Sequence, residues 1–264
     1  MSKMSQEEPN WKEVALDARE KLAEKYKEYH EKYYEYIAKY CLPSWNKLPG
    51  EKYIVHDSNK INHNFLNIIK SKKVENHNSP FWNIQTSRKK TNNFWRKMQS
   101  QVWAVRNIKD CDFLVLLDTD IEVLDFNEKM FKQELENFVE TGHVWATGRS
   151  QSRLHDSGFI VFNMQHPDLY TLVDEYENIW DSGEIFNLKK SYDGNAVESM
   201  FDKWPSYKIM NTDYGRGLHI YDVGVVHYGS KMPKQMRAEC TTDAKQMLNE
   251  YTKDIIVKRY KDAK

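Results

Sequence analysis

The sequence predicts an α/β fold, a sandwich in which helices flank a mainly parallel central sheet. Segments with helical spacing of apolar residues alternate with short apolar runs, and this alternation is typical of parallel α/β sheets. The clearest run is residues 113–117 (FLVLL), which is too short for a helix and is flanked by aspartates, as expected for a buried central strand. With 264 residues, of which 13% are aromatic, the chain can bury a large core.

Composition excludes several classes of protein. The 39 Lys and Arg balance 39 Asp and Glu, which argues against a nucleic-acid partner bound through phosphate neutralisation. The three cysteines are too few and too widely spaced for a disulfide framework or a zinc site, so we expect reduced thiols. No apolar run is long enough for a transmembrane segment, and the first ten residues lack a secretory signal. These features predict a soluble, cytoplasmic protein.

The N-terminal region, residues 1–50, is expected to be a helical segment that precedes a single domain at residues 51–264. Residues 11–40 have the spacing of one long helix, with Lys and Glu in equal measure on its polar face. A stripe on the other face consists of Ala15, Ala18, Leu22, Tyr26, Tyr29, Tyr33, Tyr36 and Tyr40. We expect this stripe to pack on the domain; the alternatives are a homodimer seam and, less favoured by the charge balance, a membrane surface. Pro43 and residues 48–50 should end the region.

Between the N-terminal segment and the central strand, we expect one strand at residues 52–56 and helices at 62–72 and 93–108. Residues 75–93 are polar and rich in Asn and Ser, so they predict a loop with one short strand near Ile84. The second helix offers the core its residues Trp95, Met98, Val102, Trp103 and Val105.

After the central strand, helices and strands continue to alternate. Helices are expected at residues 127–140, 167–180, 193–203 and 241–260, and strands at 144–148, 158–163 and 220–227. Thr241 or Thr242 is the expected N-cap of the last helix. The alternation supports the α/β class, and no internal repeat is present.

The first chemical motif is Asp118-Thr119-Asp120, directly after the apolar run. Ligands of open α/β sheets bind beyond the carboxyl ends of the strands. Two carboxylates in this position can reach Mn²⁺ or Mg²⁺, which in turn can hold a diphosphate. The alternative is a pair of solvated or capping aspartates at a strand end.

The second motif is His227-Tyr228-Gly229-Ser230-Lys231, which follows another apolar stretch. A neutral histidine is a good metal ligand, Gly229 allows close approach of an oxyanion, and Lys231 offers a positive charge to a phosphate. Taken alone, His227 fits a satisfied histidine at a strand end. With the two aspartates it completes a candidate Asp/Asp/His metal site.

Together these residues resemble the GT-A class of nucleotide-sugar glycosyltransferases, which carry an Asp-x-Asp (DxD) motif after a hydrophobic strand and a late histidine. The glycogenin-like and bacterial galactosyltransferase branches have a late His-x-x-Gly-x-x-Lys, whereas this chain has the tighter His-x-Gly-x-Lys. Lys234, three residues further on, is a second candidate for the phosphate contact.

The resemblance extends over about residues 81–234. Residues 95–97 resemble the family's Trp/Lys-bearing helix before the DxD strand, and residues 155–163 resemble its Asn-Ser-Gly-hydrophobic strand in the donor pocket. Residues 193–197 resemble its Asp-Gln-x-x-Leu segment, with Gly194 where Gln is usual. This departure weakens any transfer of a retaining mechanism centred on that glutamine.

The resemblance implies a metal-dependent hexosyl- or pentosyltransferase that moves a sugar from a nucleotide-diphosphate donor, with a UDP-sugar expected, to a glycan or other hydroxyl acceptor. Mn²⁺ or Mg²⁺ would bind Asp118, Asp120 and His227, and Asp118 could instead reach the ribose. Lys231, Gly229 and Lys234 would contact the phosphates. If the enzyme inverts configuration, Asp193 or Asp156 would be the general base, against the alternative of capping or turn aspartates.

Two parts of the donor and acceptor sites are less defined by the sequence. Residues 53–56 are either the first nucleotide-binding strand, with His56, Asp57 and Ser58 near the nucleotide, or the second strand. Trp180, Tyr192 and Trp204 are aromatic candidates for stacking on a sugar, against the alternative of core packing.

Two other functions compete with this interpretation. A non-catalytic module of the same fold would bind nucleotide or sugar without turnover, but the complete set of Asp, Asp, His and Lys argues against a decayed site. A HAD-type phosphatase also has an Asp-x-Asp after a strand. Its motif wants Thr or Val two residues after the second aspartate, where this chain has Glu122.

Overall fold

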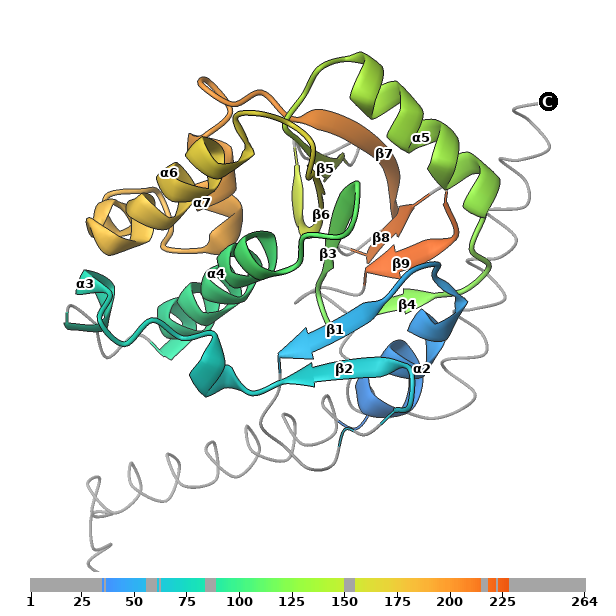
Figure 1. The fold of residues 1–264 in the computed structure, drawn as a ribbon, viewed down its shortest axis with the longest axis horizontal. Helices are drawn as coiled ribbons and strands as arrows, with labels where there is room; N and C mark the ends of the chain where they lie inside the picture. Colours follow the sequence, from blue (N-terminus) through green and yellow to red (C-terminus); the bar gives the residue numbers. More distant parts are fainter. Residues whose placement is uncertain are drawn as a thin grey trace, which may run out of the picture.

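The chain adopts a mixed α/β fold in the computed structural model, which describes residues 35, 37–55, 61, 63–83, 89–149, 155–214, 218–221 and 223–227 (Figure 1). The expected helix at residues 241–260 and most of the one at 11–40 lie outside the described residues. None of the described helices is long and apolar enough to cross a bilayer.

The larger sheet has seven strands in the order β3-β6-β5-β7-β8-β9-β4. They are β3 Phe113–Leu117, β4 Ile121–Val123, β5 Trp145–Arg149, β6 Asp156–Asn163, β7 Tyr207–Tyr214, β8 Leu218–Tyr221 and β9 Val225–His227. Only β5 and β7 are parallel within this sheet, so the prediction of a mainly parallel sheet is wrong. Short connections, such as the turn between β8 and β9, join antiparallel neighbours, whereas parallel strands need long crossovers.

A separate two-stranded parallel sheet is formed by β1 (Lys52–Val55) and β2 (Leu66–Ile69). The strand expected at residues 52–56 is confirmed as far as Val55, but the helix expected at 62–72 is wrong. There the chain forms β2 and the short 3₁₀ helix η3 (Ser71–Lys73). The asparagines in this segment are poor helix formers, and the isoleucines favour a strand.

The central strand expected at residues 113–117 is confirmed as a strand, but β3 stands at one end of the described strand order and its side chains are only half-buried. Both of its faces are nevertheless covered. Leu114 and Leu116 pack in one hydrophobic cluster, and Phe113, Val115 and Leu117 pack in the other. Coverage of both faces explains why the run is continuously apolar although the strand is not central.

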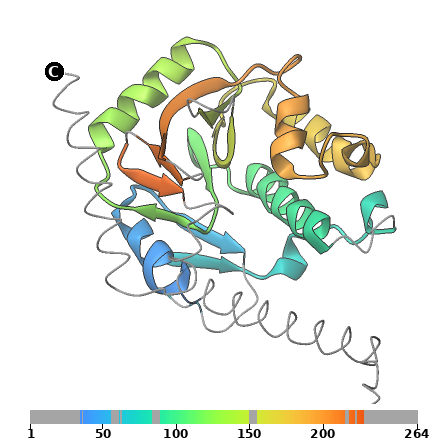
Figure 2. The same cartoon turned by 180° about the vertical axis from the view of Figure 1, so that it is seen from behind.

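Helices cover the sheet in two groups, which Figures 1 and 2 show from opposite sides. On one side α4 (Lys89–Asn107), α6 (Leu169–Asp181) and α7 (Asp193–Ser199) share a core with Trp145 and Phe162. On the other side α5 (Glu128–Glu140) packs on Phe159 and Val161.

Four helices expected from the spacing are therefore present, although two differ in extent. The helix α4 begins before residue 93, and α7 ends before the expected residue 203. A further short helix, α3 (Pro80–Asn83), and the 3₁₀ helix η4 (Glu184–Phe186) were not anticipated. Asn127 caps α5, because its side chain accepts a hydrogen bond from the backbone N–H of Met130.

The described part of the N-terminal segment is a chain of short helical turns, η1 (Ile37–Cys41), α2 (Leu42–Ser44) and η2 (Trp45–Lys47). Pro43 does not end it, because proline is tolerated in the first turn of a helix and here lies in the first turn of α2.

These turns cover the end strand β4. The indole nitrogen of Trp45 donates to the carbonyl of Ile121 at 2.9 Å, and the hydroxyl of Ser44 accepts from the N–H of Val123 at 2.8 Å. Side chains thereby satisfy polar backbone atoms at an edge of the sheet. The division of the chain at residue 50 stays a prediction, although residues 37–47 share the core of the larger sheet.

Candidate metal centre

The Asp-x-Asp segment is a tight turn between two strands. The N–H of Asp118 donates to the carbonyl of Gly158 at 2.9 Å, and the N–H of Ile121 donates back to the carbonyl of Asp118 at 3.0 Å. The chain therefore leaves β3 and enters β4 within three residues, a strand that the sequence did not predict. The turn holds both carboxylates beyond the end of β3.

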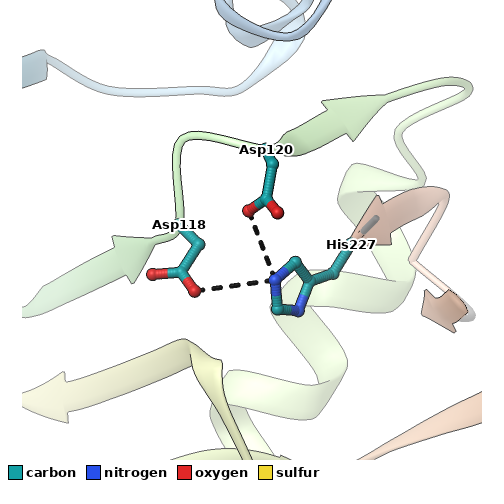
Figure 3. A group of neighbouring side chains, drawn as sticks. All are labelled: Asp118, Asp120 and His227. Carbon is teal, nitrogen blue, oxygen red and sulfur yellow. Dashed lines mark ion pairs between the residues drawn. The ribbon is translucent and has the colours of Figure 1, made fainter. Parts of the chain in front are cut away.

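Strand pairing brings the late histidine to these carboxylates. In the antiparallel pair of β4 and β9, Ile121 is opposite His227, so His227 lies beside Asp120. Its Nε2 atom is 3.3 Å from Asp120 Oδ1 and 3.5 Å from Asp118 Oδ2 (Figure 3). One ligand atom from each of the three residues lies within 4.8 Å of the others.

The prediction of a single strand at residues 220–227 is wrong, because the chain forms two strands there, β8 and β9. The turn between these strands matters for the site. Gly224 has a φ of +86°, and a Cβ atom there would lie 1.8 Å from the carbonyl oxygen of Asp125. Only glycine fits this turn, which reverses the chain between β8 and β9 and returns β9 alongside β4.

The donor set fits a divalent cation. The two carboxylate oxygens suit Mn²⁺ or Mg²⁺, and the imidazole nitrogen favours the transition metal Mn²⁺ of the two. The second ring nitrogen of His227, Nδ1, lies 2.9 Å from Asp156 Oδ2, so Nε2 is the nitrogen that faces the two aspartates. This is the arrangement expected of a metal-binding histidine, whose other nitrogen is held by a carboxylate.

The charges of the site are strongly coupled. Burial lowers the pKa of His227, but the carboxylates of Asp156 and Asp120 outweigh it and raise the pKa well above its ordinary value. Burial raises the pKa of Asp118, against the opposing effects of Lys97 and His227. A cation bound at Nε2 would displace a proton there, so metal binding would release a proton.

Lys97 joins the candidate metal centre to a fourth carboxylate, that of Asp193. Its Nζ atom, on α4, is 2.5 Å from Asp118 Oδ1 and 2.5 Å from Asp193 Oδ2, and it also donates to the carbonyl of Ser157 at 3.2 Å. Burial by itself would lower the pKa of Lys97. The carboxylates of Asp118 and Asp193 raise it by more, so the pKa is raised overall and the amine stays charged.

Lys97 belongs to the family-like pattern at residues 95–97, but no role at the site was predicted for it. Helical spacing was the available signal. Lys97 directly precedes the buried Met98 and lies four residues before the buried Gln101, at the border of the inward face of α4.

The two candidate bases lie in different surroundings. Asp193 is buried at the start of α7 and pairs with Lys97, whereas Asp156 is buried at the start of β6 behind His227. Nothing in the structure tests either as a base, and that role stays a prediction. Asp156 also accepts a hydrogen bond from the hydroxyl of Tyr221 at 2.5 Å, a residue that the sequence analysis did not single out.

The expected phosphate contacts Gly229, Lys231 and Lys234, and the nucleotide candidates His56, Asp57 and Ser58, lie outside the described residues. Of the three aromatic candidates for sugar stacking, Trp180 is fully buried, and the indole of Trp204 is half-buried and donates to Glu175 at 2.7 Å. Tyr192 is 38% exposed beside Asp193, with its ring 5.1 Å from that of Phe94. It is the most exposed of the three.

Replacing Lys97 with methionine is expected to lower the free energy of unfolding by about 3 kcal/mol in the presence of EDTA, because Asp118 and the buried Asp193 would lose their shared, half-buried partner. Urea denaturation measures this change. Lys132, 66% exposed and paired with Glu128, provides the control, and Lys132→Met should change stability by less than about 0.5 kcal/mol. Equal stability of the two variants would contradict the structural role of Lys97.

Comparison with known proteins adds little to this geometry. No protein-family model matches the chain, and no curated protein matches its sequence. Among solved structures, the chain is similar to a glycosyltransferase involved in the glycosylation of the major capsid of PBCV-1, with 17% identity and a TM-score of 0.33. The alignment covers 47% of this chain and 60% of that chain, less than two thirds of its length. A likeness at this TM-score carries no weight for fold or function.

Proposed function

We propose that the chain is a metal-dependent glycosyltransferase that moves a sugar from a nucleotide-diphosphate donor, a UDP-sugar first among those to test, to a hydroxyl acceptor such as a glycan. The observation that supports this proposal is the convergence of Asp118, Asp120 and His227 beside the strand ends, with Lys97 connecting them to Asp193. A cation held by carboxylates next to a half-buried lysine suits an anionic donor such as a nucleoside diphosphate.

The residues of the chain would have distinct tasks. Asp118, Asp120 and His227 would hold Mn²⁺ or Mg²⁺, which when bound offsets the negative charge that develops on the departing diphosphate. Lys97 fixes the rotamer of Asp118 through Oδ1, so Oδ2 stays directed toward His227 Nε2. Such fixed positions reduce the reorganisation needed when charge develops.

On the acceptor side, the proposed general base is Asp193. Its Oδ2 atom is engaged by Lys97, so a substrate hydroxyl would meet Oδ1. The exposed ring of Tyr192 is adjacent in the chain and could cover the apolar face of a sugar at this position. Asp156 lies behind the imidazole with both oxygens engaged, Oδ1 by the N–H of Gly158 and Oδ2 by Tyr221 and His227, so it is the weaker candidate base.

The test is thermal unfolding of the chain with UDP and with GDP, each in Mn²⁺ and in EDTA. A ligand that binds only the folded state at 100 times its Kd stabilises by about 2.7 kcal/mol. For a domain of this size that is roughly 5–10 °C in Tm. We expect a rise of this order with one nucleotide in Mn²⁺ and little or none in EDTA, and uridine without phosphates as the control should have no effect.

The outcomes separate the parts of the proposal. Stabilisation by Mn²⁺ alone, with no further effect of either nucleotide, would contradict the nucleotide-sugar donor but would still support the metal site. Stabilisation by UDP or GDP that is equal in EDTA would contradict the metal dependence. Release of nucleoside diphosphate from a panel of nucleotide sugars then distinguishes an enzyme from a module that only binds.

A further inference from the structure

We infer that Asp156 is a positioning residue, which holds the imidazole of His227 so that Nε2 faces Asp118 and Asp120. The inference rests on the metal site of the proposed function and assigns to Asp156 a role other than general base. It is carried by the contacts of Asp156, by the space around them, and by the number of donors that meet at one carboxylate.

Within the part of the chain that the structure describes, three polar groups converge on Asp156. Its Oδ1 atom accepts a hydrogen bond from the N–H of Gly158 at 2.9 Å, which fixes the plane of the carboxylate. Its Oδ2 atom accepts from the hydroxyl of Tyr221 at 2.5 Å and lies 2.9 Å from His227 Nδ1. The carboxylate is thus immobilised on one side and holds the histidine on the other, and all of these groups are buried.

Two glycines make room for this arrangement. A Cβ atom at Gly158 would lie 2.3 Å from His227 Cε1, and a Cβ atom at Gly148 would lie 2.3 Å from the hydroxyl oxygen of Tyr221. The ring of His227 therefore fills the space that a side chain at position 158 of β6 would take. The ring of Tyr221 fills the corresponding space at position 148 of β5. The ring of Tyr221 also stacks on Phe159, with centroids 4.7 Å apart.

A carboxylate fits this position because it accepts at both oxygens, as the N–H of Gly158 and the tautomer of His227 with a proton on Nδ1 require. Asparagine at position 156 would keep one acceptor oxygen and place an amide NH₂ against either the N–H of Gly158 or the pair of Tyr221 and His227. Against Gly158 the amide would set donor against donor in a buried site, which costs free energy. Against His227 it would either do the same or favour the tautomer with the proton on Nε2, the nitrogen that faces Asp118 and Asp120. Outer-shell changes of this kind cost 10–100-fold in metal affinity.

The experiment measures Mn²⁺ binding by electron paramagnetic resonance and, separately, Tm in EDTA. Asp156→Asn is expected to weaken Mn²⁺ binding about 10–100-fold. Tyr221→Phe, which removes one hydroxyl and leaves the ring, is expected to weaken it less, by about 3–10-fold, within the range for the net contribution of a typical hydrogen bond. Both variants should also lower Tm.

A matched control separates positioning from stability. Thr147, on β5, is fully buried, and its hydroxyl bonds to that of Ser206 at 3.0 Å without touching His227. Thr147→Val should lower Tm in EDTA as Tyr221→Phe does and leave Mn²⁺ affinity at the parent value.

The results distinguish this inference from the proposal on which it rests. A parent chain that binds no Mn²⁺ would overturn the metal site and the positioning role together. A parent that binds Mn²⁺, with a folded Asp156→Asn of equal affinity, would overturn the positioning role alone. If Asp156→Asn does not fold, Tyr221→Phe decides, and an affinity equal to that of Thr147→Val would overturn the inference.

Discussion

Asp120→Asn is expected to abolish the Mn²⁺-dependent stabilisation by nucleotide and to reduce Mn²⁺ affinity by more than about 100-fold, beyond the range of outer-shell changes. The carboxylate of Asp120 is buried, and its Oδ1 atom lies 3.3 Å from His227 Nε2. An amide has nearly the same shape but no charge, and its nitrogen cannot bind a cation. The measurements are Mn²⁺ titration and thermal unfolding with UDP or GDP.

Asp112→Asn is the matched control for this prediction. Asp112 is exposed and directly precedes β3, so the same loss of charge occurs at the other end of this strand, away from the site. This variant should keep both the Mn²⁺ affinity and the nucleotide effect of the parent. Retention of both by Asp120→Asn would show that the Asp-x-Asp segment is not the metal site.

Gly158→Ala is expected to displace the ring of His227 and to weaken Mn²⁺ binding at least about tenfold. The added methyl would lie 2.3 Å from His227 Cε1 and 2.6 Å from Nδ1, so the imidazole must move. It cannot move without changing its contact with Asp156 or the direction of Nε2. Overpacking of this kind costs about 1–3 kcal/mol, so Tm should fall while the chain stays folded.

Gly194→Ala serves as the glycine control. The nearest atoms to a Cβ there are His155 Nε2 at 3.4 Å and Ser157 Oγ at 3.6 Å, which are ordinary contacts. Gly194 is also inside α7, where alanine is the better helix former, so stability should be unchanged or slightly higher. If Gly158→Ala bound Mn²⁺ as tightly as Gly194→Ala, His227 would not be a ligand in the arrangement described.

Local sequence patterns were sufficient to predict those strands and helices that have a clear apolar run or a clear helical spacing of apolar residues. The apolar run of residues 113–117 is a strand, and helical spacing predicted α4, α5 and α6 to within a few residues at most of their ends. The same patterns could not decide whether neighbouring strands are parallel. That choice depends on which strands pair, and the pairing is non-local.

Two of the failures have a shared cause. Residues 66–69 were predicted as helix because a short apolar run fits either type of structure, and β4 was missed because only three residues separate it from β3. Short segments carry too little periodicity to distinguish helix from strand, so packing decides.

The sequence by itself determined which side chains could hold a cation, because Asp118 and Asp120 follow an apolar strand and His227 ends another. Only the tertiary structure decided that they meet, since 106 or more residues separate the histidine from the aspartates and the register of β4 on β9 brings them together. It also revealed Lys97, Tyr221 and the glycine at position 158 as neighbours of the site. Their roles depend on distances between strands and helices, which no local pattern of residues contains.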